Sequence, residues 1–109
     1  MKRLLTVLGL LSAAVFAFSM VASMKVFDAT YGINPDSNLG KAKCLVCHLT
    51  MKGGKTLNAY GKDLQAAMHA KGTKKMSEDI LKGVEKLDSD KDGMSNIDEI
   101  KADRNPGEK

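Results

Sequence analysis

Three residues that can bind a cofactor lie within five positions of the chain. Cys44 and Cys47 are the only cysteines, and His48 directly follows the second one. On a helix, residues three positions apart lie on one face, so both thiols can add to the two vinyl groups of one haem. The imidazole of His48 is then placed to bind the iron, and this spacing is typical of covalent haem attachment. The segment therefore predicts haem c, with Cys44 and Cys47 as thioether ligands and His48 as the proximal axial ligand.

Other uses of such a cysteine pair stay open at this point. Cys44 and Cys47 can form a structural disulfide in an exported protein. A thioredoxin-type redox pair needs a β-α-β context, which this sequence lacks. A zinc site needs further cysteine or histidine ligands, and only His69 is left to supply one.

The distal side of a haem iron needs a separate ligand, which in electron carriers is usually methionine or a second histidine. Met68 is the first candidate, because it lies on the apolar stripe of a helix expected over 57–70. Met76 is the second, because it precedes the next helix and aligns with its apolar face. His69 is the third, since it lies about 100° round the helix from Met68. An open sixth position and plain core packing of each methionine are the alternatives.

An acidic segment near the end of the sequence matches the calcium-loop pattern D-x-[DN]-x-[DN]-G-x₅-E over residues 88–99. Such loops supply oxygen ligands from alternating positions and a bidentate glutamate at the last one. The ligand positions are held here by Asp88, Asp90, Asp92, the backbone carbonyl of Met94, Asn96 and Glu99. Gly93 permits the sharp turn, and without a cation the clustered carboxylates repel one another. The segment therefore predicts bound Ca²⁺.

The calcium loop lacks one feature of paired EF-hands. Its eighth position is Ser95, where paired EF-hands place an aliphatic residue. The loop is therefore more similar to the unpaired EF-hand-like loops of dockerin and thrombospondin type 3 repeats. A single loop indicates structural calcium, with a dissociation constant on the order of 10⁻⁴–10⁻³ M as in extracellular modules. An acidic helix start that binds no metal is the alternative.

The elements before these sites are expected to be short. Residues 25–43 are expected to form an irregular arm, in which Phe27 and Tyr31 share one face of a helical turn. A short helix is expected from about Leu39 through His48, and Gly53-Gly54 ends it.

Two further helices carry apolar stripes at helical spacing. The first runs over 57–70 and ends at Gly72; its stripe consists of Leu57, Tyr60, Leu64 and Met68. The second begins after an N-cap at Ser77; its stripe consists of Ile80, Leu81, Val84 and Leu87. A short helix follows the acidic loop, and no segment shows strand alternation. The expected fold is all-α, with a calcium loop and helix at its C-terminal end.

The size and composition of the chain also favour a bound cofactor. The chain has 109 residues, of which 5% are aromatic and none is tryptophan. That length allows one small domain. Because such a domain buries little apolar surface, a disulfide, metal or cofactor is expected to stabilise it.

The first residues have the pattern of a secretory signal peptide. Two basic residues precede an apolar run over 4–18, and small residues follow it. We expect cleavage after Ala22 or Ser23, so that 1–23 is the signal peptide and 24–109 the mature domain. This predicts a periplasmic location. An uncleaved membrane anchor is the alternative, because the uncharged run could just span a bilayer.

Charge is distributed unevenly along a chain whose formal net charge is +4. The middle of the chain has one acid, Asp63, among eight lysines: Lys41, Lys43, Lys52, Lys55, Lys62, Lys71, Lys74 and Lys75. A lysine-rich haem edge is expected to orient acidic redox partners, and a plain solvated surface is the alternative. Nucleic acid is not an expected partner, because the chain has only two arginines and no aromatic residues interleaved with its lysines.

The motif Cys44-x-x-Cys47-His48, followed by the run LNAYG at 57–61, resembles small monohaem c-type cytochromes of the bacterial periplasm. It is similar to cytochrome domains of anaerobic bacteria that respire metals or sulfur, and the resemblance covers about residues 40–107. It implies a cytochrome c-like helical domain wrapped around one haem, which transfers single electrons between respiratory partners. The helical order departs from that of class I cytochromes, which have a clearer N-terminal helix.

Three functions follow from these features. The first is a periplasmic electron carrier, which needs no catalytic residues. The second is a haem-based binder or sensor of small ligands, which needs an open or weak sixth position. The third is a calcium-stabilised interaction module whose cysteines form a disulfide. The sequence contains no recognisable catalytic triad, phosphate-binding loop or pair of acid–base carboxylates, so an enzyme is not expected.

Overall fold

The structure is a computed structural model that describes residues 22–52 and 56–109. Within these ranges it is mostly helical and has no strand, and one isolated antiparallel bridge joins His48 to Leu57. Residues 22–31 are helical. The elements that follow are α2 (Asn38–Ala42), the 3₁₀ helix η1 (Lys43–Val46), α3 (Ala59–Ala70), α4 (Glu78–Gly83) and α5 (Asn96–Lys101). The expected all-α class is therefore confirmed.

Two expectations fall on residues that the structure does not describe. The signal peptide expected at 1–23 lies outside the described residues except for Ala22 and Ser23. The helix break expected at Gly53-Gly54 also lies outside them. In the described part of the chain, no helix is both long and apolar enough to cross a bilayer.

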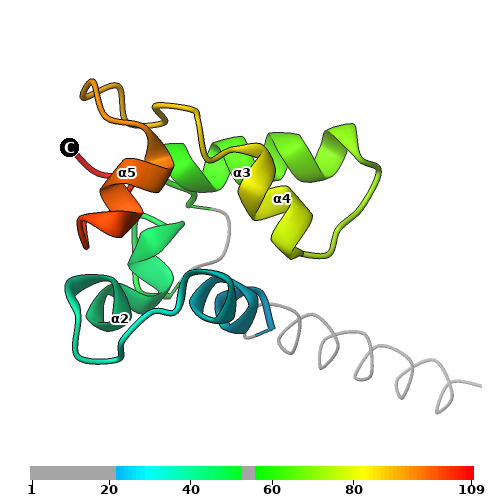
Figure 1. Ribbon diagram of the computed structural model, residues 1–109. Helices are drawn as coiled ribbons and strands as arrows, with labels where there is room; N and C mark the ends of the chain where they lie inside the picture. Colours follow the sequence, from blue (N-terminus) through cyan, green and yellow to red (C-terminus); the bar gives the residue numbers. More distant parts are fainter. Residues whose placement is uncertain (1–21, 53–55) are drawn as a thin grey trace, which may run out of the picture.

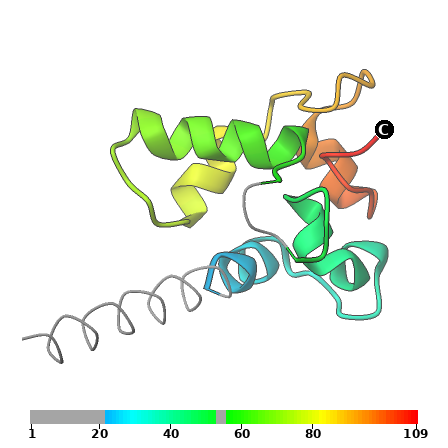
Figure 2. The ribbon, with the colours of Figure 1, turned by 180° about the vertical axis from the view of Figure 1, so that it is seen from behind.

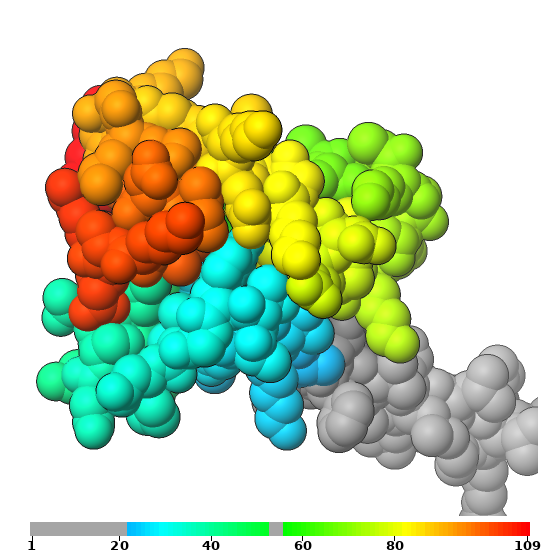
Figure 3. All heavy atoms as spheres, viewed as in Figure 1, coloured from blue at the N-terminus to red at the C-terminus, as the bar shows by residue number. Residues whose placement is uncertain are grey.

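The helices gather around one core. Helices α3 and α4 lie side by side, η1 and α5 lie near the beginning of α3, and α2 adjoins η1 (Figures 1 and 2). Every helical element contributes to the buried apolar residues, which are Phe27, Leu39, Val46, Tyr60, Leu64, Ile80, Leu81, Val84 and Ile100. From one side, the residues that precede α2 cover the core between α4 and α5 (Figure 3).

The caps that the sequence predicts are present. The hydroxyl oxygen of Ser77 accepts a hydrogen bond from the Ile80 N–H and so caps α4. Gly72 has a φ of +66° directly after α3, and Thr73 N–H donates to the Met68 carbonyl, which together end that helix. Leu87 was expected on the apolar stripe of α4, but it is 46% exposed. Because α4 already ends at Gly83, Leu87 no longer shares the phase of its apolar face.

The irregular arm expected over 25–43 is wrong in its first part, because 22–31 are helical. The aromatic pair explains the difference. Phe27 packs edge-on against Tyr31 and Tyr60, with ring centroids 5.3 and 6.3 Å apart. The Tyr31 hydroxyl also donates to Glu85 at 2.9 Å. These tertiary contacts stabilise a helix that the local sequence signals only weakly.

The helix expected from Leu39 through His48 is also partly wrong. Ser37 caps α2, but the chain leaves the α-helix at Lys43, where φ is +50°. It continues as η1 only to Val46, so His48 lies outside any helix and pairs with Leu57 instead. Residues three apart in a 3₁₀ turn lie above one another, so this tighter turn keeps Cys44 and Cys47 on one side.

Candidate functional site

The Cys44–His48 segment forms one tight turn. The Cys44 carbonyl accepts hydrogen bonds from Cys47 N–H at 3.3 Å and from His48 N–H at 2.9 Å. Both cysteines are free and half-buried. After the turn, Leu49 N–H donates to the Thr56 carbonyl at 2.8 Å, beside the bridge between His48 and Leu57. The motif is therefore the beginning of a small closed loop that leads into α3.

Two asparagines hold the carbonyls of this turn. The side-chain N–H groups of Asn58 donate to Leu45 O at 3.1 Å and to Val46 O at 2.9 Å. Its backbone N–H donates to Cys47 O at 2.9 Å, and its side-chain oxygen caps α3. Asn105 donates to Leu45 O at 2.8 Å from 60 residues further along the chain. The sequence analysis missed both roles, although an asparagine directly before an apolar helical stripe does signal a cap.

Asn58→Ala should destabilise the protein by about 3 kcal/mol, because it removes a helix cap and two bonds to carbonyls of the turn. Ser77→Ala is the matched control: it removes only a cap and should cost about 1 kcal/mol. Asn58→Ser keeps a capping oxygen but is too short to replace both amide bonds, so most of the loss should remain. Urea unfolding followed by helical circular dichroism measures all three. Equal losses for Asn58→Ala and Ser77→Ala would contradict the role given to the amide.

Gly61 allows α3 to approach the turn closely. A Cβ atom at this position would clash with the carbonyl oxygen of Cys47 and would press on Leu57. Gly61 is fully buried in the first turn of α3, where glycine is otherwise a poor helix former. Gly61 therefore lies where the backbone of α3 contacts the backbone of the Cys44–His48 segment.

Gly61→Ala should destabilise the protein by about 2–3 kcal/mol, because the clash outweighs the better helix propensity of alanine. Gly83→Ala is the control within the same chain. A Cβ atom at Gly83 would meet nothing within 4 Å, so that variant should be unchanged or more stable by up to about 1 kcal/mol. Thermal unfolding of both variants tests this, and a stable Gly61→Ala protein would contradict the close contact.

Two buried polar atoms around the turn have no hydrogen-bond partner among the described residues. They are His48 Nδ1 and the hydroxyl of Tyr60, which is 1% exposed. Burial raises the pKa of the Tyr60 hydroxyl, as do the nearby Tyr31 and Cys47. Since buried polar groups are almost always paired, unpaired ones indicate a group that the polypeptide does not supply. Both atoms are free to pair with a bound cofactor or with an ordered water molecule.

The raised pKa of the Cys47 thiol argues against a redox-active cysteine pair. Burial raises the pKa of the Cys47 thiol to about 12, and the neighbouring Cys44 adds to the shift. Reactive redox cysteines instead have a lowered pKa. A zinc site at the cysteines is not indicated either. Among the described residues, the one group of three or more potential metal-binding side chains is an acidic cluster far along the chain.

The three distal-ligand candidates lie in different surroundings. Met68 in α3 and Met76 before α4 are partly buried against the core to which Cys47 also belongs. His69 is exposed on α3. The two methionines therefore lie against the core, and the histidine lies in solvent.

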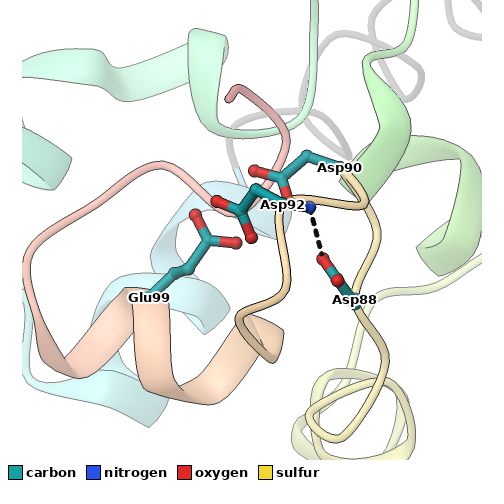
Figure 4. Close-up of side chains that lie close together, drawn as sticks. All are labelled: Asp88, Asp90, Asp92 and Glu99. Carbon is teal, nitrogen blue, oxygen red and sulfur yellow. Dashed lines mark hydrogen bonds between the residues drawn. The ribbon is translucent and has the colours of Figure 1, made fainter.

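The acidic loop brings four carboxylates together, as the sequence predicts. Asp88, Asp90, Asp92 and Glu99 each offer an oxygen, and these oxygens lie within 4.8 Å of one another. The side chain of Glu99 reaches from α5 toward the loop that carries the three aspartates (Figure 4). Gly93 has a φ of +93°, so it makes the expected sharp turn.

Two of the four carboxylates are buried without compensation. Glu99 is 0% exposed, and neither of its carboxylate oxygens has a partner among the described residues. Asp90 is 7% exposed, and its Oδ2 is likewise unpartnered. Burial, followed by the charges of Asp90 and Asp92, raises the pKa of Glu99 to about 7. Burial and the charge of Asp92 also raise the pKa of Asp90.

The loop's own N–H groups are directed at its first residue. Gly93 N–H donates to Asp88 at 2.8 Å and Asp92 N–H donates to it at 3.2 Å. Although partial burial opposes ionisation of Asp88, these N–H groups outweigh it, so its pKa is lowered. A cation would therefore meet one carboxylate stabilised by backbone N–H groups and two whose buried oxygens have no hydrogen-bond partner among the described residues.

The two remaining predicted ligands are placed differently. Asn96 is fully buried and uses its side chain inside the protein: its amide donates to Val84 O and Ser89 Oγ, and its oxygen accepts from Ser89 N–H. These bonds join the start of α5 to the loop. Met94 N–H donates to Asp92 at 2.9 Å. Ser89 Oγ also donates to Asp63 at 2.6 Å, which ties the loop to α3.

The lysines expected around the motif are available to partners. The seven that the structure describes are all exposed: Lys41, Lys43, Lys52, Lys62, Lys71, Lys74 and Lys75. Two large apolar side chains just after the motif are exposed as well, Leu49 at 61% and Met51 at 53%. Among these, Lys41, Lys43 and Lys52 are close to the motif in the chain, so exposed positive charge and exposed apolar side chains both occur near it in the sequence.

When the chain was compared with protein families, with curated proteins and with solved structures, no match was found. The site is therefore interpreted from its own residues.

Proposed function

We propose that this protein is a periplasmic c-type cytochrome that carries single electrons between respiratory partners. The observation that carries the proposal is the turn at Cys44–His48. It contains two free cysteines three residues apart at a 3₁₀ turn, and His48, whose buried Nδ1 has no partner among the described residues. In this proposal Cys44 and Cys47 form thioethers and His48 is the proximal ligand.

The haem would supply one reversible iron couple, and the chain's residues would fix its surroundings. Asn58 and Asn105 hold the turn, so the imidazole and both sulfurs keep one orientation. The Tyr60 hydroxyl offers a buried hydrogen-bond donor to the haem periphery. The exposed lysines would orient acidic redox partners, whose encounter rate rises with such charge. No step requires a catalytic residue.

Met68 remains our first candidate for the distal ligand. It is half-buried on the core side of α3, and a thioether ligand raises the potential of a haem iron. Met76 is the next candidate, and the exposure of His69 favours it least.

Carbon monoxide tests this function against that of a ligand sensor. The full chain is produced with a haem-attachment system, and its reduced absorption spectrum is recorded with and without the gas. An electron carrier with methionine as the sixth iron ligand gives a c-type spectrum that the gas leaves unchanged. Met68→Ala should then admit carbon monoxide, while Met51→Ala, an exposed methionine, should not. A wild-type spectrum that shifts with the gas would replace the carrier by a sensor with an open position.

We also propose that the acidic cluster binds Ca²⁺ as a structural ion. The proposal rests on Glu99, whose two buried oxygens have no hydrogen-bond partner in the described part of the chain and point toward the aspartates. A hard divalent cation that prefers carboxylate oxygens compensates this arrangement directly.

A further inference from the structure

The segment after α5 contacts the haem motif as well as the acidic cluster. Glu99 lies in α5, and Asp103 follows the end of that helix. The Asp103 carboxylate accepts the N–H groups of Asn38 and Leu39, both at 2.9 Å, at the start of α2. Two residues later, Asn105 donates to the Leu45 carbonyl inside the cysteine turn. One short segment therefore joins the two candidate sites.

This segment has a fixed shape. Its turn starts from α5, where Arg104 N–H donates to the Glu99 carbonyl at 2.8 Å. Asp103 has a φ of +58°, and the Asn105 side chain accepts from Gly107 N–H at 2.9 Å. A Cβ atom on Gly107 would clash with the Asn58 side chain, which holds the same turn from the other side. The segment and Asn58 thus form one packed unit around Leu45.

The acidic cluster lies at one end of this connection and is destabilised when it holds no cation. Without a cation, the buried carboxylate oxygens of Glu99 have no hydrogen-bond partner among the described residues, and the charges of Asp90 and Asp92 act on them. The repulsion among these carboxylates opposes the position of α5. A cation that binds only the ordered arrangement stabilises every contact that requires it. The contacts of Asp103 and Asn105 require α5 to be in place, because they follow it directly.

We propose that binding of a divalent cation at the acidic cluster orders the Cys44–His48 turn through residues 103–107, with Asn105 as the positioning residue. The biological meaning of this coupling rests on the proposed function, since it would make haem attachment and the haem environment depend on Ca²⁺. The coupling itself involves only the polypeptide and the cation. It can therefore be measured whether or not haem is bound.

Hydrogen exchange measured by mass spectrometry tests the coupling on the full purified chain. Two peptides are compared in Ca²⁺ and in a chelator, one covering 43–50 and one covering 88–101. In the wild type, Ca²⁺ should slow exchange in both peptides by at least about tenfold. In Asn105→Ala, Ca²⁺ should still slow exchange over 88–101 but should lose most of its effect over 43–50.

Asn34→Ala is the matched control. The Asn34 side chain only accepts from Asp36 N–H in an exposed turn, so this variant should keep the wild-type response in both peptides. The proposal is overturned if Ca²⁺ slows 88–101 but not 43–50 in the wild type, or if Asn105→Ala responds like the wild type. The second result would mean that the cation acts only through global stability. No response in either peptide overturns it as well, because the cation then does not bind.

The absorption spectrum of the same preparation separates this proposal from the proposed function. Coupled exchange without a haem band would refute the cytochrome and retain the coupling. A haem band with uncoupled exchange would refute the coupling alone.

Discussion

Replacing Cys44 and Cys47 together by serine is expected to abolish covalently bound haem in protein produced with a haem-attachment system. Both thiols lie on one side of the turn at η1, and serine hydroxyls do not form thioethers with vinyl groups. The variant should run as a colourless band on a denaturing gel stained for haem, whereas the wild type should give one stained band.

Single replacements and an unrelated variant control this result. Cys44→Ser and Cys47→Ser should each leave one site for a thioether, so some haem is retained with an altered spectrum. Met51→Ala changes an exposed residue just after the motif and should attach haem normally. Circular dichroism checks that the double variant is still helical. Haem that stays attached through denaturation of the double variant would rule out the thioether assignment.

Calcium is expected to stabilise the full chain strongly. For a dissociation constant of about 10⁻⁴–10⁻³ M, Ca²⁺ at about 10 mM should add roughly 1.4–2.7 kcal/mol to the free energy of unfolding. For a domain of this size, that raises the melting temperature by about 6–14 °C relative to chelator. Differential scanning calorimetry in Ca²⁺ and in chelator measures the shift.

Glu99→Gln should remove most of this calcium effect. In chelator the variant should be more stable than the wild type by at least about 1 kcal/mol, because it removes a buried, uncompensated charge. In Ca²⁺ it should gain little, because it has lost a charged bidentate ligand. Asp88→Ala should also abolish the response, but it removes an acceptor for two N–H groups of the loop.

Asp98→Asn is the matched control for Glu99→Gln. It neutralises the adjacent acid in the first turn of α5, but Asp98 is exposed and lies outside the cluster. The variant should keep the full calcium response and should not gain stability in chelator. A calcium shift retained by Glu99→Gln, or an equal gain in chelator for Asp98→Asn, would contradict the metal site.

Much of the structure was predictable from local sequence patterns. The stripe with Tyr60 and Leu64 predicted the buried face of α3, and Ser77 predicted the start of α4. These features depend on residues within one or two helical turns. The acidic cluster was predictable for the same reason, since the loop from Asp88 to Ser95 and the first turn of α5 bring its four carboxylates together.

Features that depend on distant contacts were not predictable from local patterns. The helix over 22–31 is stabilised by packing of Phe27 against Tyr60 and by the bond from Tyr31 to Glu85. No local pattern indicates that Asn105 binds Leu45, because 60 residues separate them. Asn96 fits the ligand pattern of a calcium loop, yet it holds Val84 and Ser89 because its side chain is buried beneath the loop.

The change from α-helix to 3₁₀ turn at Lys43 was also not predictable from the sequence. Neither Lys43 nor its neighbours is a helix breaker, and the positive φ arises where α2 meets the turn held by Asn58. The spacing still predicts that the two cysteines lie close together, because residues three apart lie close in both helix types.

The intact mass of the protein, purified after production with a haem-attachment system and measured under denaturing conditions, tests the central claim most directly. The cytochrome assignment predicts a mass equal to that of the polypeptide plus one haem, with no free thiol left to alkylate. A polypeptide of unmodified mass, in which Cys44 and Cys47 are both alkylated or are joined as a disulfide, would contradict it.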